Sequence, residues 1–144
     1  MSYASLLNRT EIAGVYHLPQ GAREALLDAA RANDFYVFRV NLTGIDSKAR
    51  MLQALAEAMR FPDWFGGNFD ALADCLTDLD GPDVPGYLVL LENCDALRAK
   101  AADDFALALE LFDAAAAEWR EQDVPFWCLV DMQADGLAWL PTIA

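Results

Sequence analysis

The chain has 144 residues, 56% of them hydrophobic, which is enough to bury the core of one globular domain spanning 1–144. Its formal net charge of −13 excludes the basic surface that nucleic acids and anionic membranes require, and it favours a basic protein as partner. No stretch approaches ~18 uninterrupted apolar residues, and the N-terminus has no basic leader followed by an apolar segment, so we expect a cytoplasmic protein.

The first 34 residues predict one strand followed by one helix. The segment 13–19 (AGVYHLP) is short and apolar and stops at Pro19, which is typical of a strand. Residues 22–34 (AREALLDAARAND) are rich in helix formers, and Asn33-Asp34 is a suitable terminator. The side chains expected to face a core are Leu26, Leu27 and Ala30.

A second strand and a second helix are expected next. Residues 35–42 (FYVFRVNL) are aromatic and β-branched, as strands commonly are. The helix is expected at 48–60, capped by Asp46 or Ser47 and ended by Phe61-Pro62, because the residue before a proline disfavours the α conformation. Its buried side would consist of Met51, Leu52, Leu55 and Met59.

The stretch FPDWFGGNFDALADCLTDL (61–79) places an aromatic-glycine loop before another helix, for which Asn68 is a good N-cap. At 100° per residue, Asp70, Asp74 and Asp78 fall within an arc of about 80°. The opposite, apolar arc holds Leu72, Cys75, Leu76 and Leu79. Like charges at this spacing each cost an isolated helix about 0.2–0.5 kcal/mol, so the acidic side is expected to face water or a partner.

The rest of the chain predicts two strands around a long helix. Residues 86–93 (GYLVLLEN) form a nearly continuous apolar run, as expected for a strand covered on both faces. A long helix is expected at 101–121, and the last strand at 124–132. The alternation predicts an α/β fold with a small, mostly parallel β-sheet of three to four strands packed with helices, in which residues 13–18 supply the fourth strand at an edge.

The acidic residues are concentrated in one part of the chain. Residues 61–97 contain eight acidic residues and no lysine or arginine, whereas residues 1–60 contain seven basic and six acidic residues. A general solubilising charge would not require this distribution. It favours an acidic face that attracts a basic partner.

The sequence gives little indication of a metal site or of a catalytic nucleophile. Cys75, Cys94 and Cys128 are widely spaced and form no C-x-x-C pair, so we expect buried thiols in a reducing compartment. His17 is the only histidine, so a zinc site would lack ligands and a Ser-His-Asp arrangement would depend on His17 alone. We therefore expect no metal and no cofactor. Paired carboxylates can act in glycoside hydrolysis, but acids are abundant here, so we expect a protein that is not an enzyme.

The segment FPDWFGGNFDALADCL resembles the signature of barstar-like proteins, which are intracellular inhibitors of ribonucleases. The matching residues are Trp64, Phe65, Gly66, Asn68, Asp70, Ala71, Leu72, Asp74 and Leu76. The order of elements from Phe35 to Asp131 is also similar to that of the family. The resemblance implies a family core at 35–132 and an N-terminal extension at 1–34 within a single barstar-like domain.

The resemblance also implies inhibition by a plug that enters the nuclease cleft. Asp74 would be the central carboxylate, Asp70 its neighbour one turn earlier, and Trp64 the aromatic contact of the loop. Gly66 and Asn68 would shape that loop. Two carboxylates at i and i+4 on a rigid helix suit the arginines and lysines of a phosphate-binding cleft. The implied partner is a basic ribonuclease, with no role for nucleic acid or a membrane.

Some positions depart from the family pattern and leave the target enzyme open. Ala73 stands where family members often carry tryptophan, and Leu79 where some carry an aromatic residue. In the later helix, Glu118 matches an acidic position while Ala114 does not. The alternative is a binding, immunity or regulatory module of the same fold that acts on a partner other than a ribonuclease. The predicted contact residues are Trp64, Gly66, Asn68, Asp70, Ala73, Asp74 and Glu118.

Overall fold

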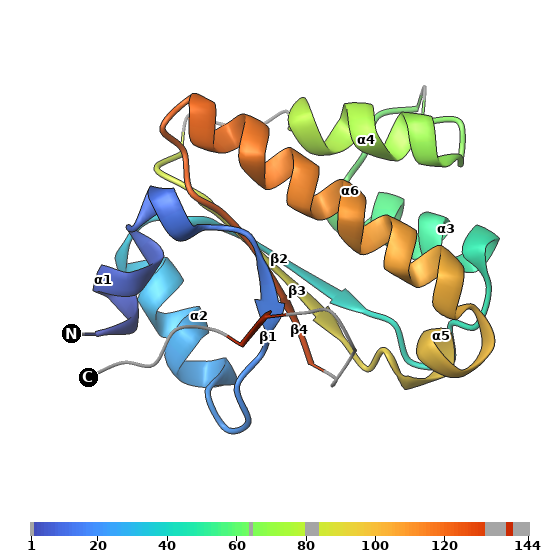
Figure 1. Ribbon diagram of the computed structural model, residues 1–144, viewed down its shortest axis with the longest axis horizontal. Coiled ribbons are helices and arrows are strands. Elements are labelled where there is room, and N and C mark those ends of the chain that lie inside the picture. Colours follow the sequence, from blue (N-terminus) through green and yellow to red (C-terminus); the bar gives the residue numbers. More distant parts are fainter. Residues whose placement is uncertain (1, 64, 80–83, 132–137, 140–144) are drawn as a thin grey trace.

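A parallel β-sheet lies at the centre of the computed structural model, which describes residues 2–63, 65–79, 84–131 and 138–139 (Figure 1). The strands are β1 (Val15–His17), β2 (Tyr36–Asn41), β3 (Tyr87–Glu92), β4 (Phe126–Val130) and β5 (Ala138–Trp139). Their order is β2-β3-β4-β1-β5, and every neighbouring pair is parallel. The predicted α/β fold with a small parallel sheet is confirmed.

The helices occupy most of the connections between strands. They are α1 (Tyr3–Leu7), α2 (Arg23–Ala32), α3 (Lys48–Met59), α4 (Phe69–Thr77), α5 (Asp95–Lys100) and α6 (Ala102–Glu121), with a 3-10 helix at Thr10–Ile12. The predicted long helices are confirmed as α2, α3 and α6, with small shifts at their ends. The helices α1 and α5 were not predicted, because five and six residues are too short to show a helical period.

The three predicted core strands are confirmed as β2, β3 and β4. The segment 13–18 supplies β1, which joins them beside β4 with Val15 opposite Cys128. It does not form the outer edge, since the two-residue strand β5 pairs with its other side. A strand of two residues is too short to show the alternation of apolar and polar residues by which strands are predicted.

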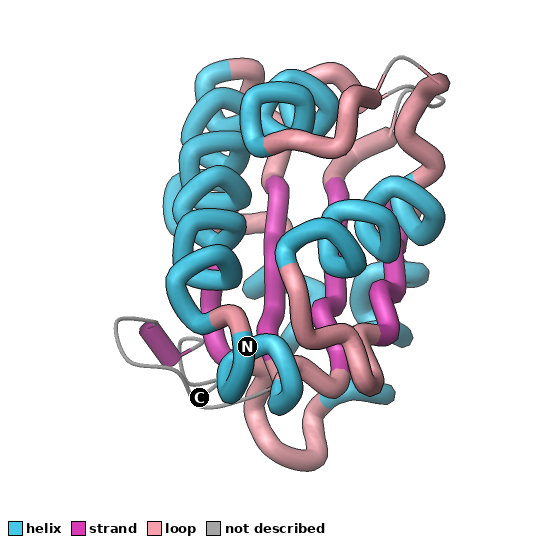
Figure 2. The backbone as a smooth tube through the Cα atoms, turned by 90° about the vertical axis from the view of Figure 1, so that its right-hand side faces the viewer, coloured by secondary structure: helices cyan, strands magenta, loops and turns pink. Residues whose placement is uncertain are grey.

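Helices cover both faces of the sheet (Figure 2). On one face α3, α4, α5 and α6 pack against Tyr87, Val89 and Leu91 of β3 and against the matching residues of β2 and β4. On the other face α1 and α2 pack against Leu88 and Leu90. All six residues of β3 are therefore buried, as predicted for a strand covered on both faces.

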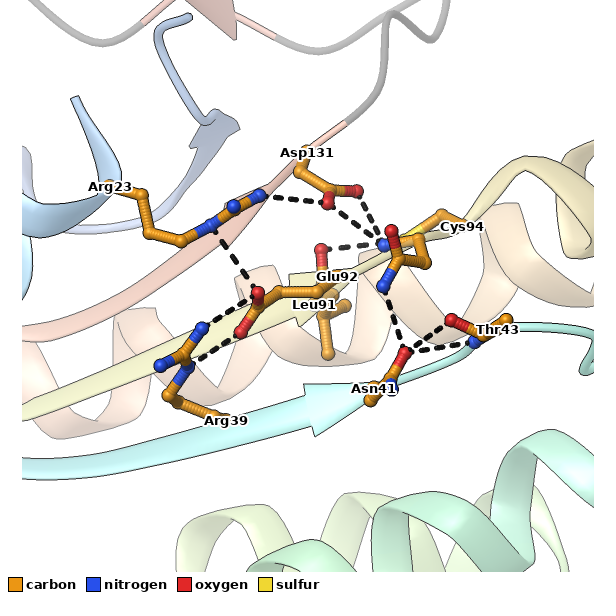
Figure 3. A network of polar contacts seen from close by, with 9 residues as sticks. Arg23, Arg39, Asn41, Thr43, Leu91, Glu92, Cys94 and Asp131 are labelled. Atoms are coloured by element: carbon orange, nitrogen blue, oxygen red, sulfur yellow. Dashed lines mark hydrogen bonds and ion pairs between the residues drawn. The ribbon is translucent and has the colours of Figure 1, made fainter. Parts of the chain in front are cut away.

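A polar network joins the carboxyl ends of the strands to α2 (Figure 3). Arg39 donates two hydrogen bonds to the Glu92 carboxylate, and Arg23 lies 3.3 Å from the carboxylates of both Glu92 and Asp131. Asp131 accepts hydrogen bonds of 2.8 and 2.9 Å from the backbone N–H of Asn93, which has a left-handed φ of 61°. These charged groups are directed at one another, so we assign the network a structural role.

Candidate protein-binding site

Two glycines and an asparagine shape the loop before α4. Gly67 has a φ of 68°, a left-handed conformation that favours glycine. A Cβ atom on Gly66 would lie 3.3 Å from Nδ2 of Asn68, so a side chain there would crowd the cap. The Asn68 Oδ1 accepts a hydrogen bond of 2.7 Å from the backbone N–H of Ala71. The predicted N-cap is confirmed.

The aromatic part of the loop is anchored to the core through Phe65. The Phe65 ring is half-buried, and its centroid lies 5.1 Å from that of Phe61. Its backbone N–H donates to the carbonyl oxygen of Pro62 at 3.0 Å. Phe65 therefore packs against the core and holds the loop to it. Trp64, the expected aromatic contact with a partner, lies outside the described residues.

Helix α4 has one buried face and one acidic face, as predicted. Leu72, Cys75 and Leu76 are buried, and Leu79 packs half-buried against the same core. We call Asp70, Asp74 and Asp78 the acidic stripe; all three are exposed. Ala73 is half-buried immediately before Asp74, and its methyl group adds little contact area. The two faces follow from the helical period, because residues four apart share a side.

Among the described residues, no ion pair involves the acidic stripe. The acidic residues that do form ion pairs lie elsewhere in the described part of the chain, and they are Glu11, Asp28, Asp46, Glu92 and Asp131. One cation does approach the first turn of α4 from α3, since Lys48 Nζ lies 4.5 Å from the centroid of the Phe69 ring. Burial raises the pKa of the Cys75 thiol, and the charges of Asp74 and Asp78 raise that pKa further. The negative field of the stripe therefore reaches the buried side of α4.

Helix α6 lies beside α4 and carries Glu118 (Figure 1). The two helices are joined at Trp119, whose Nε1 donates a hydrogen bond of 2.9 Å to the carbonyl oxygen of Leu76. Glu118 precedes Trp119 and is exposed, whereas Arg120 follows it and donates to the carbonyl oxygen of Ala13. The structure thus places Gly66, Asn68, Asp70, Ala73 and Asp74 on one loop-helix unit, and Glu118 on the neighbouring helix.

A cavity of about 150 Å³ adjoins both the loop and the acidic stripe. Its lining includes the rings of Tyr36, Phe38, Phe61 and Tyr87 and the charged residues Arg60 and Asp78. These residues come from β2, β3, α4 and the end of α3, so no local pattern could have predicted the cavity. Asp78 belongs to both the stripe and the cavity lining, and Cys75 and Leu79 of the apolar side line the cavity as well.

The described residues include no group of three or more His, Cys, Asp or Glu side chains that could hold a metal ion. Cys75, Cys94 and Cys128 are buried free thiols, as predicted, and His17 is buried. Burial raises the pKa of the Cys94 and Cys128 thiols, which keeps both protonated. In the part of the chain that the structure describes, no helix has both the length and the apolar character needed to cross a bilayer.

Comparison with protein families gives a match over most of the chain. The family model described as Barstar (barnase inhibitor) matches residues 35–131. The matched region contains β2 to β4 and α3 to α6, so it includes the loop, the acidic stripe and Glu118. A comparison with curated proteins found no match to this chain.

Proposed function

This chain belongs to the barstar family, and on that premise we propose that it binds a basic ribonuclease and blocks its RNA-binding cleft. The observation that carries the proposal is the exposed acidic stripe, whose aspartates have no ion pair among the described residues. A cleft that holds RNA phosphates does so with arginine and lysine. The same cations are suitable partners for Asp70 and Asp74. The family description names an inhibitor, and we propose no catalytic role.

The proposed contact surface centres on Asp74, with Asp70 one turn earlier on the same rigid helix. Gly66 and Asn68 would present the loop, and the remaining proposed contacts are Trp64, Ala73 and Glu118. Repulsion between the aspartates opposes helix formation in the free protein. Cations from the partner would remove that repulsion, so charge that is unfavourable in isolation becomes favourable in the complex.

We further propose that the protein acts in the cytoplasm. The support is the presence of three buried free thiols, a pattern that suits a reducing compartment. A cytoplasmic inhibitor of this kind would protect cellular RNA from a ribonuclease present in the same compartment.

A capture experiment with the full-length protein tests the proposed function. The immobilised protein is offered a panel of purified small basic ribonucleases, barnase among them, at about 0.15 M salt, where long-range charge attraction is largely screened. We expect at least one ribonuclease to be retained and its hydrolysis of RNA to be blocked at equimolar inhibitor. A basic protein without a nuclease cleft serves as the control.

Retention of both the ribonuclease and the control protein would show that net charge alone is responsible, and would contradict the proposal. Failure to retain any ribonuclease, together with capture of an unrelated protein from a cell extract, would favour the alternative function. In that case the fold would serve as a binding or immunity module for a different partner.

A further inference from the structure

Four of the ten residues that line the cavity beside the acidic stripe are aromatic. The rings of Tyr36 and Phe38 have centroids 4.6 Å apart, and those of Phe38 and Tyr87 are stacked at 6.4 Å with planes 10° apart. Phe61 contributes a further ring from the end of α3. A volume of about 150 Å³ is that of a cavity that holds one benzene-sized planar group.

Two charged side chains of opposite sign line the same cavity. Asp78 is exposed at the end of α4, and Arg60 is exposed at the C-cap of α3 with a left-handed φ of 55°. Neither residue takes part in an ion pair among the described residues. Asp74 lies one turn before Asp78 on the same helix, and the charges of both carboxylates act on the Cys75 thiol that lines the cavity, so the nearby charge favours a cation over an anion.

We propose that this cavity receives an arginine side chain of the basic partner. The planar guanidinium would stack on the aromatic walls and pair with the Asp78 carboxylate, two interactions that suit arginine better than lysine. Arg60 would oppose the incoming cation and limit its affinity. The proposal rests on the proposed function for the basic character of the partner, and it adds a contact separate from Asp70 and Asp74.

Titration of the full-length, ¹⁵N-labelled protein with N-acetylarginine amide tests the cavity directly. The control probe is N-acetylcitrulline amide, which has nearly the same shape and no charge. The readout is the chemical-shift change of the backbone amides of Tyr36, Leu79 and Tyr87. We expect the arginine probe to bind roughly two- to tenfold more tightly than the citrulline probe, from cation–π and carboxylate contacts.

Two variants are expected to change the affinity for the arginine probe in opposite directions. Asp78→Asn should weaken binding of the arginine probe several-fold. Arg60→Asn should strengthen it, and asparagine tolerates the left-handed conformation at this position. Unchanged spectra away from the cavity would show that both variants keep the fold.

Equal affinity for the two probes in the wild-type protein, or an arginine affinity that Asp78→Asn leaves unchanged, would overturn the proposal. Weaker binding of the probe in Arg60→Asn would overturn it too, because removal of a like charge should strengthen the binding of a cation. The proposed function fails separately, if arginine amide binds the cavity but no ribonuclease is captured. Capture of a ribonuclease without arginine binding would remove the cavity proposal alone.

Discussion

Glu92 accepts two hydrogen bonds from Arg39, from Nε at 2.7 Å and from Nη2 at 3.0 Å, across the β2–β3 pair. Arg23 reaches the same carboxylate from α2, which precedes the family match. The Arg39 hydrogen bonds hold the pKa of Glu92 below its usual range against the effect of burial, and the charges of Arg39 and Arg23 lower that pKa further. One carboxylate therefore connects the matched region to the N-terminal segment.

Replacing this carboxylate should destabilise the protein at neutral pH. Glu92→Gln removes charge-assisted hydrogen bonds to Arg39 and should cost about 1–3 kcal/mol of unfolding free energy. Because the folded pKa of Glu92 is lowered, its contribution is present above the unfolded value of about 4.3 and is lost as pH falls through the folded value. Urea denaturation of both proteins should thus show a difference at neutral pH that disappears in acid.

Glu110→Gln is the matched control for that experiment. Glu110 is exposed on α6 and has no ion pair among the described residues, so the same change of charge should leave stability nearly unaltered. Equal stability of the Glu92 and Glu110 variants at neutral pH would show that the Arg39–Glu92 pair contributes nothing net.

We also propose that the N-terminal segment and the matched region form a single domain. Leu26 of α2 is fully buried in the core cluster that contains Leu88, Leu90 and Trp127. Leu26→Ala should therefore cost about 2–5 kcal/mol, and circular dichroism and tryptophan fluorescence should report one coincident transition. Leu107→Ala, at a side chain 39% exposed on α6, should cost far less. Two separated transitions would instead indicate independent units.

The contribution of the α4 N-cap to folding stability can be tested by replacing Asn68. Asn68→Ala removes the hydrogen bond to the backbone N–H of Ala71 and should cost about 0.5–2 kcal/mol. Asn68→Ser retains a capping oxygen and should restore most of that loss. Thermal unfolding of the two variants measures the difference. Equal melting temperatures would mean that the cap does not stabilise this helix.

Local patterns were sufficient for the elements that carry the candidate site. Asn68, the four-residue spacing of the aspartates and the apolar side of α4 all belong to one helix, so a local pattern was enough to predict them. The long apolar run of β3 likewise indicated a strand covered on both faces.

Relationships between distant segments could not be predicted in the same way. The approach of Lys48 to Phe69, the pairing of Arg23 with Glu92 and the shared cavity lining depend on which helices lie side by side. The sequence did not show that α1 and α2 are the helices that cover the second sheet face, because nothing in residues 1–34 identifies the strands they pack against. The sequence indicated an extension, and the structure shows where it packs.

The sharpest test of the binding face is Asp74→Ala, assayed with the ribonuclease captured by the wild-type protein. Asp74 is exposed in mid-helix, so its removal leaves the apolar side of α4 intact. Losing a carboxylate that pairs with a desolvated cation should cost about 2–5 kcal/mol, mainly through faster dissociation. Folding stability should hold or rise slightly, because repulsion from Asp70 and Asp78 is relieved. Surface plasmon resonance and thermal unfolding measure the two effects.

Asp103→Ala is the control, since it removes the same charge from the first turn of α6, outside the proposed contact residues. If only net charge mattered, the two variants would lose affinity equally at moderate salt, and the proposed face would be wrong. A large loss for Asp74→Ala alone would not suffice if that variant also melted earlier than the wild type, because weakened folding could then explain it. Selective loss of affinity at unchanged or higher melting temperature is the outcome that assigns Asp74 to the interface.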